Sequence, residues 1–182
     1  MEADWEFEIG GDAPIIDAHW SGFVDLRAAP ERAWDLSECS SLRQLAAALI
    51  RLNGADSPVW TSKTDVFTPE HIDADEMGAS AGDATHSFGC YIDLLPRSVG
   101  TWNQHTEIES FCRDLSANLR AVHLMCCRVD LVARRAVVAD GVGVGLTAYI
   151  TACGWTSADA KTRLGECLGL LTDVIVCWKS VS

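Results

Sequence analysis

Three short segments of the sequence repeat one theme, an apolar and β-prone stretch with an aspartate at its centre. They are residues 23–27, 91–97 and 128–131, and their central aspartates are Asp25, Asp93 and Asp130. An ionised carboxylate inside a buried strand is costly unless it is paired. The pattern therefore predicts that all three aspartates lie on strands and point to one shared face of a sheet, away from the core.

The chemistry that such a face could carry is proton transfer combined with anion binding. Carboxylates can exchange protons with a bound substrate, and the neighbouring Arg27, Arg97 and Arg128 can clamp an anion. The same residues also fit a ladder of cross-strand ion pairs on a solvated sheet, each worth about 0.2–1 kcal/mol. The residue types alone leave both interpretations open.

Recognised catalytic and cofactor motifs are missing from the sequence. The Gly-Val-Gly-Val-Gly stretch at residues 141–145 falls between two expected strands, so we interpret it as a turn rather than a phosphate loop. Asp17, His19 and Ser21 follow one another along one strand face and cannot converge as a catalytic triad does. No Gly-x-Ser-x-Gly nucleophile elbow occurs.

The eight cysteines and five histidines are scattered, and no Cys-x-x-Cys pair occurs. We therefore expect reduced thiols that act as small core residues, with no bound metal and no cofactor. The adjacent Cys126 and Cys127 alternate along a strand, so they cannot be buried on the same side.

The net charge of −12 comes entirely from residues 1–100, which hold 18 acidic and 6 basic side chains. Residues 2–12 and 70–83 carry most of this excess. Such a field repels nucleic acid and anionic membranes and attracts basic partners. No apolar run could span a bilayer, and the acidic N-terminus is unlike a signal peptide, so we expect a cytoplasmic protein.

The elements that must position these residues follow from hydrophobic periodicity. The sequence predicts one domain over 1–182 with an acidic lead at 1–13, in which alternating Trp5, Phe7 and Ile9 could instead form an edge strand. An acidic loop is expected at 69–86, and a capping box at Thr106 is expected to start the second helix. Strands are expected at 15–26, 59–67, 88–95, 126–138 and 145–153, and helices over 30–52, 106–122 and from near 157.

The resulting order predicts an α+β fold of ferredoxin-like type, β-α-β-β-α-β plus an added β-α. Its helices would cover one face of a mainly antiparallel sheet, and the polar rows would share the other. Those rows also contain Phe67, Arg134, Thr147 and Thr151. The predicted binding face comprises Phe23, Asp25, Arg27, Lys63, Asp65, Tyr91, Asp93, Arg97, Arg128, Asp130 and Tyr149.

Two functions fit this face. The first is a non-catalytic protein-binding module of inhibitor, immunity or adaptor type that recognises a basic partner. The second is an enzyme or sensor for a small polar molecule that uses the aspartates and arginines. A homodimer through the open sheet face is also compatible with the pattern. A concave pocket on the polar face would favour the small molecule, and a flat face would favour the protein partner.

Overall fold

Apolar residues at alternating positions build the strands, and apolar residues three or four positions apart build the helices of this computed structural model. The structure describes residues 1–8, 14–17, 22–80, 82–98, 102, 105–138 and 141–178. Its elements are β1 (Glu2–Glu8), β2 (Ile15–Ile16), η1 (Pro30–Asp35, a 3₁₀ helix), α1 (Ser37–Ser41), α2 (Arg43–Leu52), β3 (Val59–Phe67), β4 (His86–Pro96), α3 (His105–Arg120), β5 (Cys127–Val138), β6 (Gly141–Gly154) and α4 (Ser157–Cys177).

The strands form one mixed, mainly antiparallel sheet in the order β1-β5-β6-β4-β3. β1 and the short β2 both run parallel to β5 and pair with successive parts of it, whereas all other neighbours are antiparallel. The α+β class is confirmed. The ferredoxin-like strand order is not confirmed, because β6 lies between β5 and β4 and β1 lies at the edge of the sheet.

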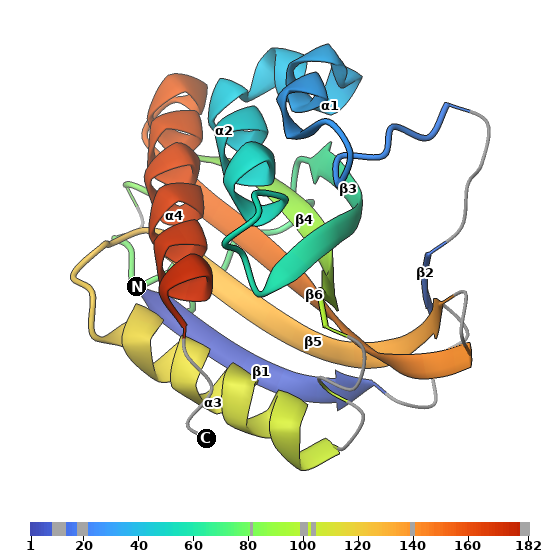
Figure 1. Cartoon of the computed structure of the whole chain (residues 1–182). Helices are drawn as coiled ribbons and strands as arrows, with labels where there is room; N and C mark the ends of the chain where they lie inside the picture. Colours follow the sequence, from blue (N-terminus) through green and yellow to red (C-terminus); the bar gives the residue numbers. More distant parts are fainter. Residues whose placement is uncertain are drawn as a thin grey trace.

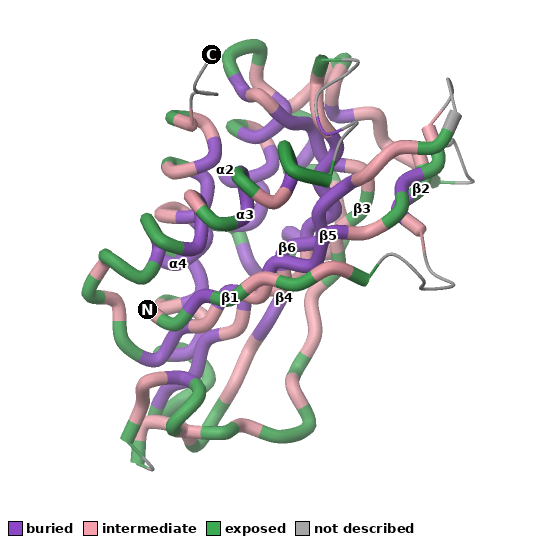
Figure 2. The backbone as a smooth tube through the Cα atoms, turned by 90° about the horizontal axis from the view of Figure 1, so that it is seen from below, coloured by how far each residue is buried: buried purple, intermediate pink, exposed green. Residues whose placement is uncertain are grey.

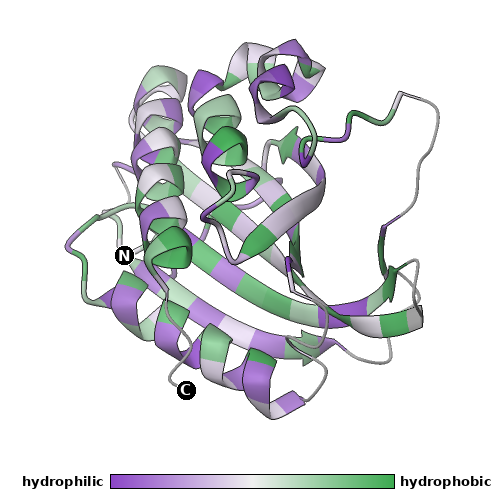
Figure 3. Cartoon of the chain, in the orientation of Figure 1, coloured by the Kyte–Doolittle hydropathy of each residue, from purple (hydrophilic) through white to green (hydrophobic). Residues whose placement is uncertain are grey.

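The helices pack on one face of the sheet, as Figures 1 and 2 show. α4 contacts β6 and β4, α3 contacts β1, and α2 packs against α4. Between these layers lies the main core, whose buried residues include Phe111 and Leu115 of α3 and Leu164 and Leu168 of α4. No helix of the described residues lies on the opposite face, which we call the open face. Hydrophilic and hydrophobic residues alternate along the strands, as this arrangement requires (Figure 3).

The acidic N-terminus forms an edge strand, which confirms the alternative that the spacing of Trp5 and Phe7 indicated. These two side chains contact each other, and the Phe7 ring contacts the His105 ring at the start of α3. Arg120 of α3 donates a hydrogen bond to the Ala3 carbonyl oxygen at 2.7 Å. Aromatic packing and this hydrogen bond therefore fix residues 2–8 in place despite their charge.

The predicted strand over residues 15–26 is wrong, because among the described residues of that range only Ile15–Ile16 is a strand. Gly22 has a φ of +86°, a left-handed conformation that ends an extended run. Asp25 lies outside any strand, and residues 26–28 form a turn. His19 and Ser21 lie outside the described residues.

The predicted helix over 30–52 is three shorter helices. Pro30 opens η1 as expected, but Leu42 leaves the helical conformation, with φ −143° and ψ 84°, and so separates α1 from α2. The capping box at Thr106 is wrong, because α3 already begins at His105. Glu109 forms an ion pair with Arg113 one turn later in the same helix.

The glycine-rich stretch at 141–145 is not a turn, which corrects the sequence interpretation. Gly143 pairs with Ala136 and Gly145 pairs with Arg134, so both glycines belong to β6. A Cβ atom at Gly145 would lie 2.8 Å from Ile15 Cδ1 and 3.0 Å from the Leu94 carbonyl oxygen. The absence of a side chain at Gly145 therefore makes room for the segment that contains β2.

Cys126 and Cys127 are both buried in different apolar clusters, but not through the alternation that the sequence predicted, because β5 begins at Cys127 and Cys126 has a φ of +63°. Cys127 lies in the main core, and Cys126 packs with Cys153 and Met77 in a smaller cluster. Residues 70–80 and 82–83 form turns and loop, in agreement with the expected acidic loop, but Met77 buries its side chain. Within the described residues, no helix has the length and apolarity needed to cross a bilayer.

Candidate functional site

The strands of the open face align their side chains in cross-strand rows. One row runs from Asp65 through Tyr91 and Tyr149 to Asp130 and ends at Asp4 of β1. The next row contains Asp93, Thr147, Val132 and Glu6. The prediction that Asp93 and Asp130 lie on strands and share one sheet face is therefore confirmed.

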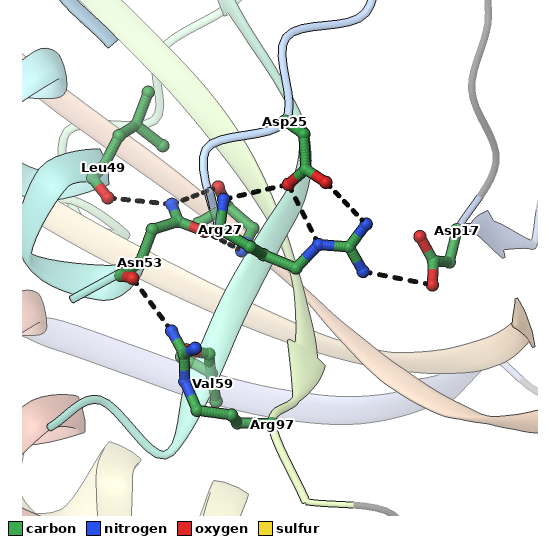
Figure 4. Close-up of polar contacts among 8 residues, drawn as sticks. Asp17, Asp25, Arg27, Leu49, Asn53, Val59 and Arg97 are labelled. Carbon is green, nitrogen blue, oxygen red and sulfur yellow. Dashed lines mark hydrogen bonds and ion pairs between the residues drawn. The ribbon is translucent and has the colours of Figure 1, made fainter. Parts of the chain in front are cut away.

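Asp25 does not join them, which corrects the third part of that prediction. Its carboxylate accepts hydrogen bonds from Arg27 Nε and Nη2, each at 3.0 Å, and from the Arg27 backbone N–H at 2.9 Å. Arg27 also reaches Asp17 at 3.4 Å, and its guanidinium lies 4.1 Å from the centre of the Trp60 ring. Figure 4 shows Arg27 between the two carboxylates. The Arg27–Asp25 pair therefore holds a turn and loop in the chain after β2, and Asp25 is not part of a strand.

Arg97 is also placed differently from the prediction, because its side chain binds backbone carbonyl groups. It donates to the carbonyl oxygens of Ser57 at 3.0 Å, Asn53 at 2.9 Å and Gly54 at 3.0 Å, just beyond the C-terminus of α2. Figure 4 shows the contact with Asn53. Carbonyl groups at a helix end lack partners within the helix, so a cation there stabilises the end. Arg97 thus joins the end of α2 to the end of β4.

A cavity of about 570 Å³ opens on the face that the helices leave uncovered. Ligand pockets in proteins usually measure roughly 300–1,000 Å³. Its polar wall comes from four neighbouring strands, β3, β4, β5 and β6, and its apolar wall from the segment around β2. The lining residues are Pro14, Ile15, Ile16, Ser62, Lys63, Tyr91, Asp93, Arg134 and Tyr149.

Residues 14–17, which we call the strap, form one wall of this pocket. Ile15 and Ile16 pair with Ala136 and Val137 of β5, and the Ser62 hydroxyl of β3 donates to the Ile16 carbonyl oxygen at 2.6 Å. The Ile15 side chain packs with Trp60, Leu95 and Ala136 in a small second core on the open face. The strap therefore connects β5 to β3 and turns one end of a sheet face into a concavity.

Asp93 is the buried carboxylate of the pocket, with 9% of its surface exposed. The Thr147 hydroxyl, directly across the strand pair, donates to Asp93 Oδ1 at 2.6 Å. Burial raises the pKa of Asp93 above its ordinary value, while the Thr147 hydrogen bond and the charges of Arg134 and Lys63 oppose the rise. Desolvation disfavours the ionised form, and here it outweighs the neighbouring positive charges.

Two cations flank the pocket, and each interacts with a tyrosine. The Lys63 ammonium lies 5.7 Å from the centre of the Tyr91 ring, and its hydrogen bond to Tyr91 raises the pKa of Lys63. The Arg134 guanidinium lies 5.5 Å from the centre of the Tyr149 ring and pairs with Glu8 at 2.7 Å. The centres of the two tyrosine rings are 5.9 Å apart, and both tyrosines line the pocket.

The other end of the open face is an ion-pair network. Arg128 Nε donates to both carboxylate oxygens of Asp130 at 2.9 Å, and Arg128 Nη1 lies 3.6 Å from Glu76. Along the neighbouring edge, the four acidic side chains of β1 alternate with its apolar ones and are exposed. This end agrees with the solvated ion-pair ladder that the sequence allowed.

The two edge strands share one feature. Asp4 of β1 accepts a hydrogen bond from the next backbone N–H, that of Trp5, at 2.8 Å. Asp65 of β3 does the same for the N–H of Val66, also at 2.8 Å. In each case the carboxylate accepts a hydrogen bond from a backbone N–H of an edge strand. Asp65 therefore binds the backbone of β3 and is not among the residues that line the pocket.

Of the predicted face residues, the structure brings Lys63, Tyr91, Asp93 and Tyr149 together in the pocket. Arg128 and Asp130 lie on the same face but outside it, and Phe23 lies beside β3 in a smaller cavity of about 160 Å³. The strap residues and Ser62 were missed as site residues, and Arg134 was placed on the face without a binding role. The signal that could have indicated the strap is Gly145, a glycine inside a strand.

No described group of three or more His, Cys, Asp or Glu side chains could hold a metal ion. The pocket offers instead a buried carboxylate, two cations and two phenols, a set that can bind and orient a polar molecule. No family model, curated protein or solved structure matches this chain. Its functional interpretation therefore depends on this geometry.

Proposed function

We propose that this chain binds a small polar molecule in the open-face pocket, as a sensor or binding protein does. The observation that carries the proposal is a cavity of about 570 Å³ whose wall combines a nearly buried carboxylate, Asp93, with Lys63, Arg134 and two tyrosines. Pockets that are mostly apolar with a few converging polar groups are the usual form of small-molecule sites. The concavity favours this function over a flat protein interface.

The chain contains only two tyrosines, and both line the pocket, which gives a direct test. Protein labelled with 3-fluorotyrosine gives two ¹⁹F signals, which Tyr91→Phe and Tyr149→Phe assign. We expect ligands from a set of polar metabolites to shift both signals. Ligands that bind while leaving both signals unchanged, or a set in which nothing binds, would contradict the proposal.

Asp130→Asn supplies the matched control for this experiment. Asp130 lies opposite Tyr149 on the same face but outside the pocket lining, and it pairs with Arg128. We expect a ligand to bind Asp130→Asn as it binds the parent chain and to bind Asp93→Asn differently. Equal effects of both substitutions would mean that the ligand recognises the face as a whole.

The acidic margin of the open face favours a second candidate function, binding of a basic protein. The exposed acids of β1 lie along the edge of that face, and Glu76 lies beside Arg128 at the same end. Charges of one sign accelerate association with an oppositely charged partner. In this function the partner would contact the acidic end, and aromatic side chains such as Tyr91 would supply contact energy.

Surface kinetics with a partner isolated from the native host test the second candidate. We expect the association rate to fall markedly as salt rises from about 50 to 500 mM, because the Debye length shrinks severalfold. Charge reversal to lysine at Glu70, Asp73, Asp75 and Glu76 should lower the association rate, whereas Phe23→Ala or Tyr91→Ala should raise the dissociation rate. An association rate independent of salt would exclude this electrostatic mechanism.

A further inference from the structure

The Asp93 carboxylate has too few partners for a charge in its position. Among the described residues, the hydrogen-bond donor to Asp93 is the Thr147 hydroxyl, a neutral group. A carboxylate has about four acceptor positions, and a buried charge normally has an ion partner. Buried polar groups that lack partners lower stability, so a site that keeps one is a candidate for a bound group.

The two cations of the pocket attract Asp93 but do not pair with it. Both Arg134 and Lys63 lower the pKa of Asp93, yet within the described residues Arg134 forms its ion pair with Glu8. Lys63 interacts with Tyr91. Arg134 Nε is buried and donates to no group in the described part of the chain. The pocket therefore holds a carboxylate and two cations whose charges remain separated.

The rest of the lining is apolar or aromatic. Pro14 and Ile16 of the strap form one side, and the paired rings of Tyr91 and Tyr149 form another. A ligand that is only an anion would meet the Asp93 carboxylate, and a ligand that is only an amine would meet Lys63 and Arg134. A molecule with both charges and an apolar part matches every element of the lining.

We infer that the ligand is a zwitterionic amino acid with an apolar side chain. Its ammonium group would lie against Asp93, its carboxylate between Lys63 and Arg134, and its side chain against Pro14 and Ile16. This inference rests on the proposed function and specifies its ligand class. Direct pairing of opposite charges, with one partner the nearly buried Asp93, is the interaction that would discriminate most strongly among ligands.

Calorimetric titration of the full chain tests each contact with a truncated probe. L-Leucine and L-phenylalanine are the complete probes, and 4-methylpentanoate, 3-methylbutylamine and glycine lack the ammonium, the carboxylate and the side chain. We expect each truncated probe to bind roughly tenfold to a hundredfold more weakly than L-leucine, as loss of a charged hydrogen bond or of apolar contact predicts.

Two substitutions separate the two charged contacts. Asp93→Asn should weaken the binding of L-leucine by roughly tenfold or more. It should leave the binding of 4-methylpentanoate unchanged or tighter, because the repulsion between the Asp93 carboxylate and an anionic ligand disappears. Lys63→Gln, at an exposed position, should weaken the binding of L-leucine and leave the binding of 3-methylbutylamine unchanged or tighter. Asp130→Asn, outside the pocket, should change none of these affinities.

The outcomes distinguish this inference from the function on which it rests. Binding of 4-methylpentanoate or 3-methylbutylamine as tight as that of L-leucine would contradict the inference that the ligand is a zwitterion. If neither complete probe binds, while another metabolite shifts the two fluorotyrosine signals, the inferred amino-acid ligand is wrong but the pocket is still a ligand site. Failure of both complete probes and of the whole metabolite set would overturn both proposals.

Discussion

Asp93 and Asp130 occupy equivalent places in two similar segments, and both point to the open face, yet their surroundings differ. Asp130 is partly exposed, and its two carboxylate oxygens share the single Nε–H of Arg128. Asp93 is nearly buried and accepts from a neutral threonine, while two cations nearby bind other groups. The Asp130 carboxylate stabilises the sheet, whereas the Asp93 carboxylate lowers the stability of the fold, and a ligand that pairs with it could offset this loss.

The difference teaches that a strand pattern fixes the direction of a side chain and not its electrostatic role. Asp130 obtains its partner from its own strand, two residues away. Asp93 is flanked within β4 by Tyr91 and Leu95, neither of which is a cation, and the strap closes over its end of the sheet. The following predictions test this contrast between the pocket end and the ion-pair end.

The largest effect is expected at Arg97, which belongs to neither end. Arg97→Ala should lower the free energy of unfolding by about 2–3 kcal/mol, because several carbonyl groups lose a charged donor. Denaturant titration measures the change, and Arg32→Ala, at an exposed ion pair, is the matched control with a loss below about 1 kcal/mol. Unchanged stability combined with lost ligand binding would place Arg97 in the site.

Gly145→Ala should disturb the pocket end selectively. The new methyl group would meet Ile15 Cδ1 at 2.8 Å, so we expect a displaced strap and a loss of about 1–3 kcal/mol in unfolding free energy. Gly143→Ala, in the same strand with no atom within 4 Å of the added carbon, is the control and should be neutral or slightly stabilising. Equal losses in both variants would mean that β6 needs glycine for its backbone alone.

Neutralising the two aspartates should change stability in opposite directions at pH 7. Asp130→Asn should lower the free energy of unfolding by about 0.2–1 kcal/mol, because Arg128 loses a partly exposed ion pair. Asp93→Asn should raise it, because an amide keeps the Thr147 hydrogen bond without a buried charge. Denaturant titration of both variants beside the parent measures the two signs, and a large loss in Asp93→Asn would contradict the contrast.

The pH dependence sharpens the same test. Burial raises the pKa of Asp93 in the folded chain above its ordinary value of 3.8, so the folded state retains this proton to higher pH than the unfolded state. Asp93 therefore makes stability decrease as the pH rises from 3.8 through the raised pKa. The gain from Asp93→Asn should be greater at pH 7 than at pH 4, and a gain that is constant with pH would contradict this account.

The smallest effect is expected at the outer rim of the ion-pair end. Glu76 is exposed and lies 3.6 Å from Arg128, so Glu76→Gln should cost less than about 0.5 kcal/mol and less still at high salt. Denaturant titration at low and high ionic strength measures it. A loss comparable to that of Gly145→Ala would show that this end is far less solvated than its exposure indicates.

The period-2 pattern predicted the α+β class, the central strands and the open-face direction of Asp93 and Asp130. It failed where tertiary contacts outweigh alternation. Residues 15–26 alternate well, but the Arg27–Asp25 pair and the positive φ of Gly22 hold the described part of 22–28 in turn and loop. The pocket could not be predicted, because the strap meets β3 and β6 through contacts between distant residues such as Ile15 and Gly145.

The side-chain acceptors on the two edge strands have a consequence for self-association. An exposed edge usually offers unpaired amides to a strand of another molecule, which is a common route to fibrils. Here Asp4 and Asp65 each bind one outer-strand amide, and Arg120 binds the Ala3 carbonyl on the same edge as Asp4. A second molecule would have to displace charged groups before it could extend the sheet, so the chain should resist fibril growth even when it is concentrated.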